Sequence, residues 1–149
     1  MKGQANMEQS ITESVLLLFL ALAGWLDRKR MMLPVILPAA GALTGILINL
    51  LTKQLSILEI AAGTGIGLMM LLVGYASRQA LGYGDGLLMA AAGCFLGSMQ
   101  TSILLLCSLL AAAVVSIILI LAKKRGWKDR IPFAPCVLAG FVFMKGIFG

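Results

Sequence analysis

The feature that most constrains this chain is the length of its stretches without a charged side chain. The longest covers residues 86–122, and four shorter ones cover 14–26, 31–52, 60–77 and 131–144. A helix that crosses a bilayer needs about 20 predominantly apolar residues. Apolar residues make up 60% of the chain and charged residues 12%, whereas a soluble domain carries about 25% charged residues. The sequence therefore excludes a water-soluble globule and predicts an integral membrane protein.

The stretch 86–122 is too long for one crossing and contains a small polar break at residues 97–100 (Gly-Ser-Met-Gln). We therefore divide it into two helices. The sequence then predicts an all-α membrane protein, a polytopic bundle of six transmembrane helices in a single domain, residues 1–149. The predicted spans are about 11–26, 32–52, 57–77, 81–97, 101–122 and 131–148.

The basic residues lie unevenly between the two sides of this bundle. Those on one side are Arg28, Lys29, Arg30, Arg78, Lys123, Lys124, Arg125, Lys128 and Arg130, and those on the other are Lys2, Lys53 and Lys145. Short loops rich in Lys and Arg stay in the cytoplasm, so we expect both termini on the outer side. Residues 123–130 are interpreted as an anchor for anionic membrane lipids. The loops are too short for a nucleic-acid-reading module, so no nucleic-acid partner is expected.

Three spans contain two glycines four residues apart. The pairs are Gly41 with Gly45, Gly63 with Gly67, and Gly93 with Gly97. Such pairs let helix backbones approach closely in lipid, so we expect them to be packing contacts.

Several kinds of chemistry are excluded by composition. The chain has no histidine, which removes Ser/His and Cys/His nucleophilic sites and the common His-ligated metals. Its cysteines, Cys94, Cys107 and Cys136, are widely spaced and lie in apolar segments, so we expect small residues that face lipid or core. No metal and no cofactor is predicted.

Two aspartates stand out among the acidic residues. Asp27 ends the first span beside a basic cluster, a place that also suits a solvated interfacial charge. Asp85 lies seven residues beyond Arg78, which is roughly 10 Å into the membrane if that segment is helical. Ionisable residues at such depth are costly and usually functional, and the glycines around Asp85 allow a peptide to come close.

The predicted orientation places both aspartates on the same side of the bilayer. Two carboxyl groups brought close do not both ionise easily, so one stays protonated beside an ionised partner. That arrangement activates water against an amide. With no other hydrolytic group in the spans, Asp27 and Asp85 are the candidate catalytic pair.

Three motifs resemble those of the type IV prepilin peptidases, a family of GxGD membrane aspartic peptidases. Residues 82–85 (Gly-Tyr-Gly-Asp) match the G-x-G-D signature, and residues 25–28 (Trp-Leu-Asp-Arg) with Pro34 resemble the region of the first aspartate. Residues 131–135 (Ile-Pro-Phe-Ala-Pro) resemble the start of the last helix. The motifs occur in family order and extend over most of the chain.

The resemblance implies an aspartic endopeptidase that removes the leader of a prepilin or pseudopilin, for a type IV pilus or protein secretion. It implies a multi-pass protein of a prokaryotic plasma (inner) membrane, with the active site toward the cytoplasm. Carried over, Asp27 and Asp85 form the catalytic dyad. The implied substrate-binding residues are Gly82 and Gly84 in the cleft and Pro132 and Pro135 in its wall.

The chain also departs from the family pattern. Leu87 stands where many relatives carry a lysine two residues after the second aspartate, and Val35 replaces an asparagine that often follows the proline after the first aspartate. The cysteine-containing cytoplasmic insert of the bifunctional members is missing, so we expect peptidase activity without N-methyltransferase activity.

Three alternatives stay open. A presenilin-like intramembrane protease shares the G-x-G-D string, but its Pro-Ala-Leu motif is absent here. A proton-coupled small membrane transporter or channel subunit would use Asp85 to carry the proton, and would need a polar path to the outer side. A structural subunit of a pilus or secretion machine would keep the fold without activity.

Overall fold

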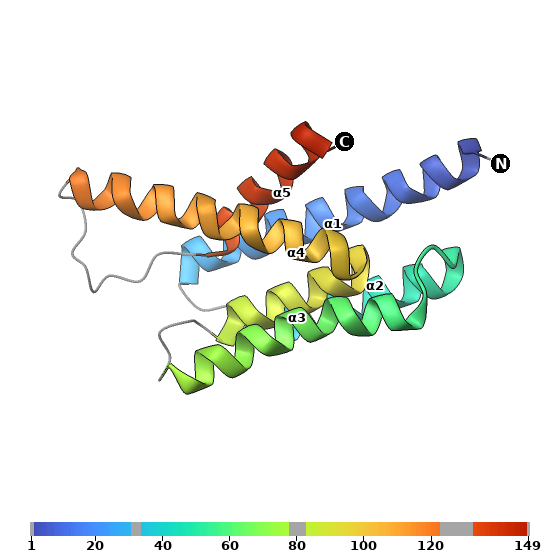
Figure 1. Cartoon of the computed structure of the whole chain (residues 1–149), viewed down its shortest axis with the longest axis horizontal. Helices are drawn as coiled ribbons and strands as arrows, with labels where there is room; N and C mark the ends of the chain where they lie inside the picture. The colour runs from blue at the N-terminus through green and yellow to red at the C-terminus, as the bar shows by residue number, and fades with distance from the viewer. Residues whose placement is uncertain (1, 31–33, 78–82, 123–132, 149) are drawn as a thin grey trace.

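A computed structural model describes residues 2–30, 34–77, 83–122 and 133–148. Within these ranges the fold is all-α, as predicted (Figure 1). The helices are α1 (Lys2–Arg30), α2 (Ile36–Thr52), α3 (Ile57–Ala76), α4 (Tyr83–Leu121) and α5 (Ala134–Phe148). Helix α1 starts well before the apolar stretch because its first residues, including lysine, glutamine and glutamate, also favour a helix.

Three of the described helices have the length of membrane spans, and all five carry exposed apolar side chains. Helices α1, α3 and α4 are long and apolar enough to cross a membrane, and α2 and α5 are apolar but shorter. Large apolar side chains such as Leu43, Met69, Leu110 and Ile118 are exposed on their outer faces. A soluble monomer rarely exposes apolar surface of this extent, so the chain is an integral membrane protein.

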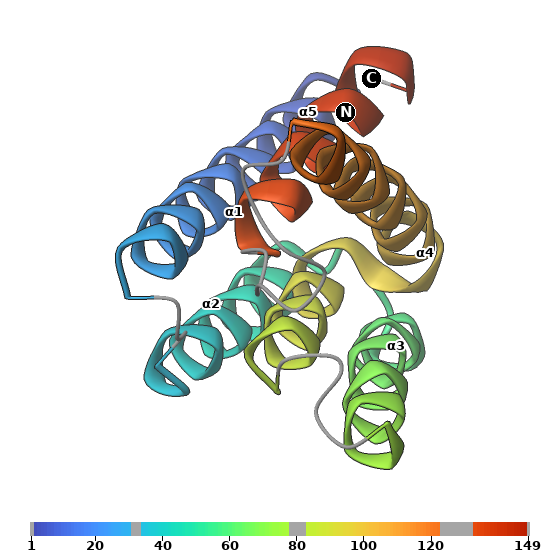
Figure 2. The same ribbon diagram turned by 90° about the vertical axis from the view of Figure 1, so that its left-hand side faces the viewer.

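Helix α4 consists of two segments that run in opposite directions. Its first segment leads away from Tyr83, and after Gly97 the chain returns beside it (Figures 1 and 2). Gly97 has φ 75° and ψ −176°, a conformation that essentially requires glycine. The break predicted at residues 97–100 is therefore confirmed, and a missing side chain is its cause.

Glycines bring α3 into close contact with the first segment of α4. A Cβ atom on Gly63 would lie 2.6 Å from the carbonyl oxygen of Gly93, and one on Gly67 would lie 2.6 Å from the Cβ of Ala90. Neither distance is tolerated by a real side chain, so the two backbones touch. The predicted packing role of these pairs is confirmed, as it is for Gly41, where a Cβ would lie 2.5 Å from the ring of Phe19.

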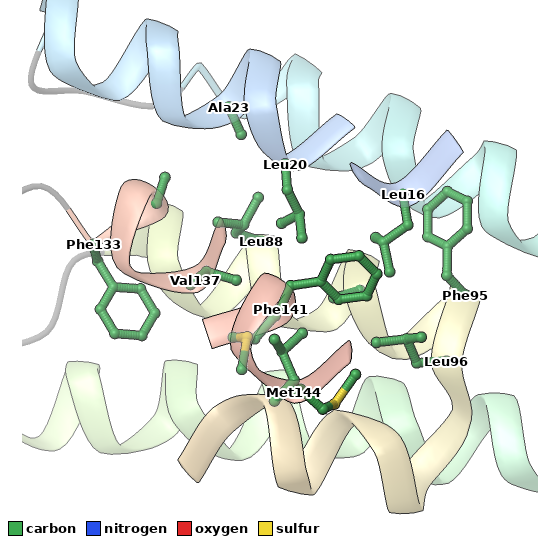
Figure 3. Packing of buried hydrophobic residues seen from close by; sticks show 14 of the residues in the cluster. Leu16, Leu20, Ala23, Leu88, Phe95, Leu96, Phe133, Val137, Phe141 and Met144 are labelled. Atoms are coloured by element: carbon green, nitrogen blue, oxygen red, sulfur yellow. The ribbon is translucent and has the colours of Figure 1, made fainter. Parts of the chain in front are cut away.

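The core lies around α5. Side chains from α1 and from the first segment of α4 meet α5 on its two sides (Figure 3). The labelled core residues are Leu16, Leu20, Ala23, Leu88, Phe95, Leu96, Phe133, Val137, Phe141 and Met144. A buried amide adds a polar link, because Asn49 Nδ2 donates a hydrogen bond of 2.5 Å to the carbonyl oxygen of Cys94 and so joins α2 to α4.

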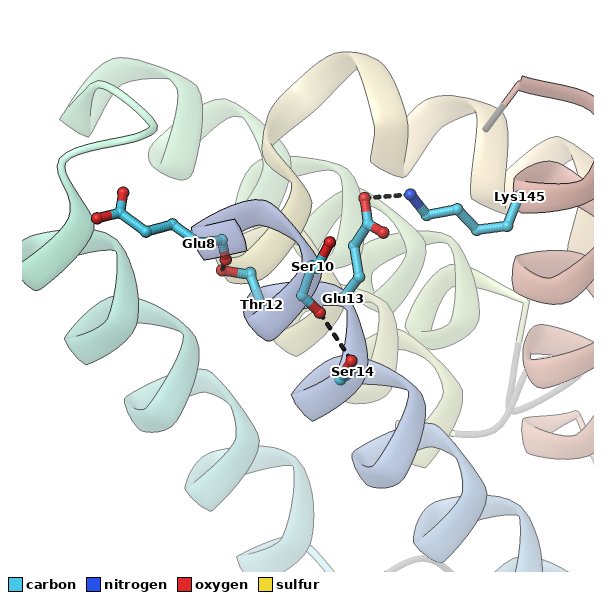
Figure 4. Close-up of polar contacts among 6 residues, drawn as sticks. All are labelled: Glu8, Ser10, Thr12, Glu13, Ser14 and Lys145. Atoms are coloured by element: carbon cyan, nitrogen blue, oxygen red, sulfur yellow. Dashed lines mark hydrogen bonds and ion pairs between the residues drawn. The ribbon is translucent and has the colours of Figure 1, made fainter. Parts of the chain in front are cut away.

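Different segments of the chain lie at the two ends of the bundle. One end carries both chain termini and the reversal of α4 at Gly97 (Figure 1). At this end Lys145 of α5 forms an ion pair with Glu13 of α1 (Figure 4). At the opposite end α1 finishes, and α4 and α5 begin (Figure 1). The candidate residues lie at that second end.

Candidate active site

Asp27 lies in the last turn of α1 and is buried, with 7% of its surface exposed. Its Oδ2 accepts a hydrogen bond of 3.3 Å from the backbone N–H of Ala134, 107 positions away in the sequence. Ala134 is the first residue of α5. The first N–H groups of a helix have no partner within that helix and attract negative charge. The carboxylate of Asp27 thus caps a second helix.

The start of α5 lies close to α1 at Gly24 and Pro135. Gly24 is buried one turn before Asp27, and a Cβ placed on it would lie 3.6 Å from the nitrogen of Pro135. The start of α5 therefore rests against α1 in ordinary van der Waals contact. Proline is tolerated in the first turn of a helix because its missing N–H needs no partner there. Pro135, a predicted wall residue, is half-buried at this contact.

Asp85 lies in the first turn of α4 and is partly buried. Gly84 beside it is also partly buried, while Gly86 is fully packed. A Cβ on Gly86 would lie 2.6 Å from Cγ of Leu71 in α3. The glycine after the aspartate therefore fixes α4 against α3, which holds the helix turn that carries Asp85.

Cys136 brings the two aspartates into one neighbourhood. It lies in the first turn of α5, is 5% exposed, and interacts electrostatically with both Asp85 and Asp27. The start of α5 therefore lies within electrostatic reach of the helix turns that carry Asp27 and Asp85. The predicted core position of Cys136 is confirmed, but its place beside both aspartates is not apparent from the sequence. Its one sequence signal is that it directly follows the motif at 131–135.

The predicted site residues Gly82 and Pro132 lie outside the described residues, as do Arg78 and the basic residues 123–130. Their roles therefore stay predictions. Within the described ranges, no three side chains of the metal-binding types gather in one place.

A polar recess of about 650 Å³ lies at the other end of the molecule, between α1, α4 and α5. It is lined by Asn6, Gln9, Ser10, Glu13, Gln100, Ile103, Met144, Lys145 and Phe148. Its charged side chains, Glu13 and Lys145, pair with each other. The recess is separate from the aspartates.

Comparison with known proteins connects this arrangement to a family. The sequence model of the type IV leader peptidase family matches residues 14–121, which include both aspartates. The prepilin leader peptidase/N-methyltransferase of Aeromonas hydrophila is 33% identical over 125 residues, covering 79% of this chain and 43% of the relative. The protein of that name from Pectobacterium carotovorum subsp. carotovorum is 31% identical over 135 residues, covering 87% and 48%.

The chain thus spans less than half the length of these curated relatives. No solved structure matches it. The family match covers well over half of the chain and relatives above 30% identity cover more than two thirds of it, and the motifs around Asp27 and Asp85 occur in the family's order. The chain therefore belongs to the type IV leader peptidase family.

Proposed function

We propose that this chain is a membrane aspartic endopeptidase that removes the leader peptide from type IV prepilin-like proteins. The observation that carries the proposal is the buried hydrogen bond that Asp27 accepts from Ala134 at the start of α5. Asp85 lies in the first turn of α4, which begins at the same end of the bundle. Membership of the type IV leader peptidase family supports the same activity.

In the proposed reaction, water hydrolyses one peptide bond. One carboxylate takes a proton from water as the water oxygen attacks the carbonyl carbon. The other carboxyl group is protonated and gives its proton to the amide nitrogen as the C–N bond breaks. Two acids close together hold one proton more firmly than either would alone, which suits Asp27 and Asp85 to this exchange.

The proposed membrane arrangement has six spans, both termini outside, and the dyad at the cytoplasmic face of a prokaryotic inner membrane. The distribution of Lys and Arg supports this orientation. A prepilin or pseudopilin would lie with its hydrophobic helix against the apolar outer faces of the bundle. The cleft residues are proposed to be Gly82 and Gly84, with Pro132 and Pro135 in the wall. The proposed activity is that of a peptidase without N-methyltransferase activity.

Packing supports hydrolysis over proton transport. A transporter that uses Asp85 needs a polar path between the aspartates and the opposite end. Most buried side chains of the described residues are apolar, among them Leu16, Leu20 and Phe141, each at most 1% exposed, and the buried polar ones other than Asp27 carry no charge (Thr12, Asn49, Thr101 and Ser108). Glu13, a glutamate toward the other end, is paired with Lys145.

Leader removal from a matched prepilin tests the proposal. The wild-type chain, in membranes or purified in lipid nanodiscs, should shorten the prepilin, and Asp27→Asn and Asp85→Asn should each abolish this while still inserting into the membrane. Glu59→Gln is a matched control, because Glu59 caps α3 through Ser56 at the other end. Processing at an unchanged rate by either aspartate variant would remove that residue from the dyad. Activity should persist in a chelator.

A further inference from the structure

The first backbone N–H group of α5 has an unusual hydrogen-bond acceptor. The residue before the helix, Phe133, has no side-chain acceptor that could cap the first turn. Pro135 has no N–H. The N–H of Ala134 therefore takes its acceptor from another helix, the Oδ2 atom of Asp27 at 3.3 Å.

This hydrogen bond is shielded from solvent. Ala134 is 0% exposed and Asp27 is 7% exposed. A hydrogen bond to a carboxylate is about twice as strong as one between neutral groups, and in a dry site it is strengthened further. The backbone of Phe133 is a further hydrogen-bond donor to the same carboxyl group, so the start of α5 favours one orientation of Asp27.

The same turn also meets the second aspartate. Cys136, two residues after Ala134, interacts electrostatically with both Asp27 and Asp85. The segment that donates to Asp27 therefore also lies within electrostatic reach of Asp85. If Asp27 served only to cap α5, no electrostatic interaction of the same turn with Asp85 would be needed.

We propose that the backbone N–H of Ala134 is the positioning group of the catalytic centre, orienting the Asp27 carboxylate toward the water and Asp85. This inference rests on the proposed peptidase function and extends it to α5, beyond the residues matched by the family model. Ala134 acts through Asp27 and does not itself touch substrate.

Removal of the N–H is the direct test. Replacing the alanine by lactic acid at position 134, through nonsense suppression, substitutes an ester for the amide and deletes the donor with little change in shape. Ala134→Pro deletes the same donor by ordinary mutagenesis, and proline is well accepted at the first position of a helix. Ala134→Val is the matched control, since valine adds two carbons as proline does but keeps the N–H. Ala134→Gly keeps the N–H and removes bulk.

We expect the ester and proline variants to lower kcat for prepilin cleavage roughly 10- to 100-fold, the range for a lost hydrogen bond to a charged group. KM should change much less than kcat, because Ala134 is fully buried and acts through Asp27. The valine and glycine variants should keep kcat within about threefold of wild type. A purely structural role for Ala134 would not separate kcat from KM in this way.

The results of these experiments separate the positioning role of Ala134 from the proposed peptidase function. Wild-type kcat in the ester variant, in a protein whose Asp27→Asn variant is inactive, would overturn the positioning role and leave the proposed function standing. An equal loss in the valine variant would also overturn it, since bulk would then be the cause. Failure of the wild-type chain to cleave any matched prepilin would overturn the proposed function, and the positioning role with it.

Discussion

Helices α1 and α5 meet through a carboxylate at each end of the bundle, and the two contacts differ in kind. Near the termini, Glu13 forms an ion pair with Lys145, and their side chains are 22% and 32% exposed. At the other end, Asp27 is buried and receives the backbone N–H of Ala134. The first contact joins two full charges at a partly solvated surface. The second joins a full charge to the end of a helix dipole.

The difference indicates what each carboxylate is for. The negative charge of Glu13 is matched by a cation, so its role is to hold α5 against α1. Asp27 is oriented by a backbone group and lies near a second carboxylate, an arrangement that suits reactivity more than stability. The following predictions test whether the two ends divide these roles.

The largest expected difference is between Asp27→Asn and Glu13→Gln. Loss of a catalytic carboxylate should lower the rate of leader removal about 1,000-fold or more, within the range for a general acid or base. Glu13→Gln should keep the rate within about threefold. Both variants are measured for cleavage of the same prepilin at equal membrane concentration. A comparable loss in both would show that the two ends do not divide these roles.

A third carboxylate beside the dyad should also be harmful. Cys136→Asp places a like charge within reach of Asp27 and Asp85, which disturbs their sharing of one proton. We expect kcat to fall at least about 10-fold. Cys136→Asn, nearly the same shape without the charge, is the control and should fall much less. Equal rates for these two variants would contradict the electrostatic relation of Cys136 to the aspartates.

The helix that carries Asp85 depends on close packing against α3. Gly67→Ala forces a methyl group into Ala90 and should lower the free energy of unfolding by about 1–3 kcal/mol. Gly65→Ala, two residues earlier, meets nothing within 4 Å and should change stability by less than about 1 kcal/mol. Thermal unfolding in detergent measures both. A similar loss at both positions would show that helix propensity alone sets the effect.

The smallest effect is expected at the ion pair. Removal of one partner, as in Glu13→Gln or Lys145→Gln, should cost at most about 1 kcal/mol, as is usual for partly exposed pairs. The exchange Glu13→Lys with Lys145→Glu should restore most of the loss, and added salt should reduce the coupling. A double-mutant cycle on the unfolding free energy gives this coupling. A value near zero would leave apolar packing as the sole link at that end.

Much of the fold could be predicted from the sequence because apolar length and glycine spacing are local properties. The apolar stretches predict a helix at each place where one is observed, although α1 begins well before its stretch, and the polar break predicts the reversal of α4 at Gly97. The glycine pairs predict close packing of helices, and the structure shows that Gly63 packs against Gly93. Six membrane crossings and their orientation stay predictions.

The contacts between distant helices could not be predicted in the same way. These helices are apolar on nearly all sides, so hydrophobic periodicity does not fix how each is rotated about its axis. The bond between Ala134 and Asp27, the pairing of Lys145 with Glu13, and the position of Cys136 all depend on that rotation. The sequence motifs indicated the two aspartates but not the backbone group that orients one of them.

Synthesis on the ribosome proceeds from α1 toward α5, and this order bears on the bond between Asp27 and Ala134. A nascent chain that has inserted α1 to α4 already contains both aspartates, yet its Asp27 still lacks the donor from α5. Full proteolytic competence would then arrive only with the insertion of α5. Under the proposed function, an unfinished chain would therefore cut prepilins more slowly than a finished one.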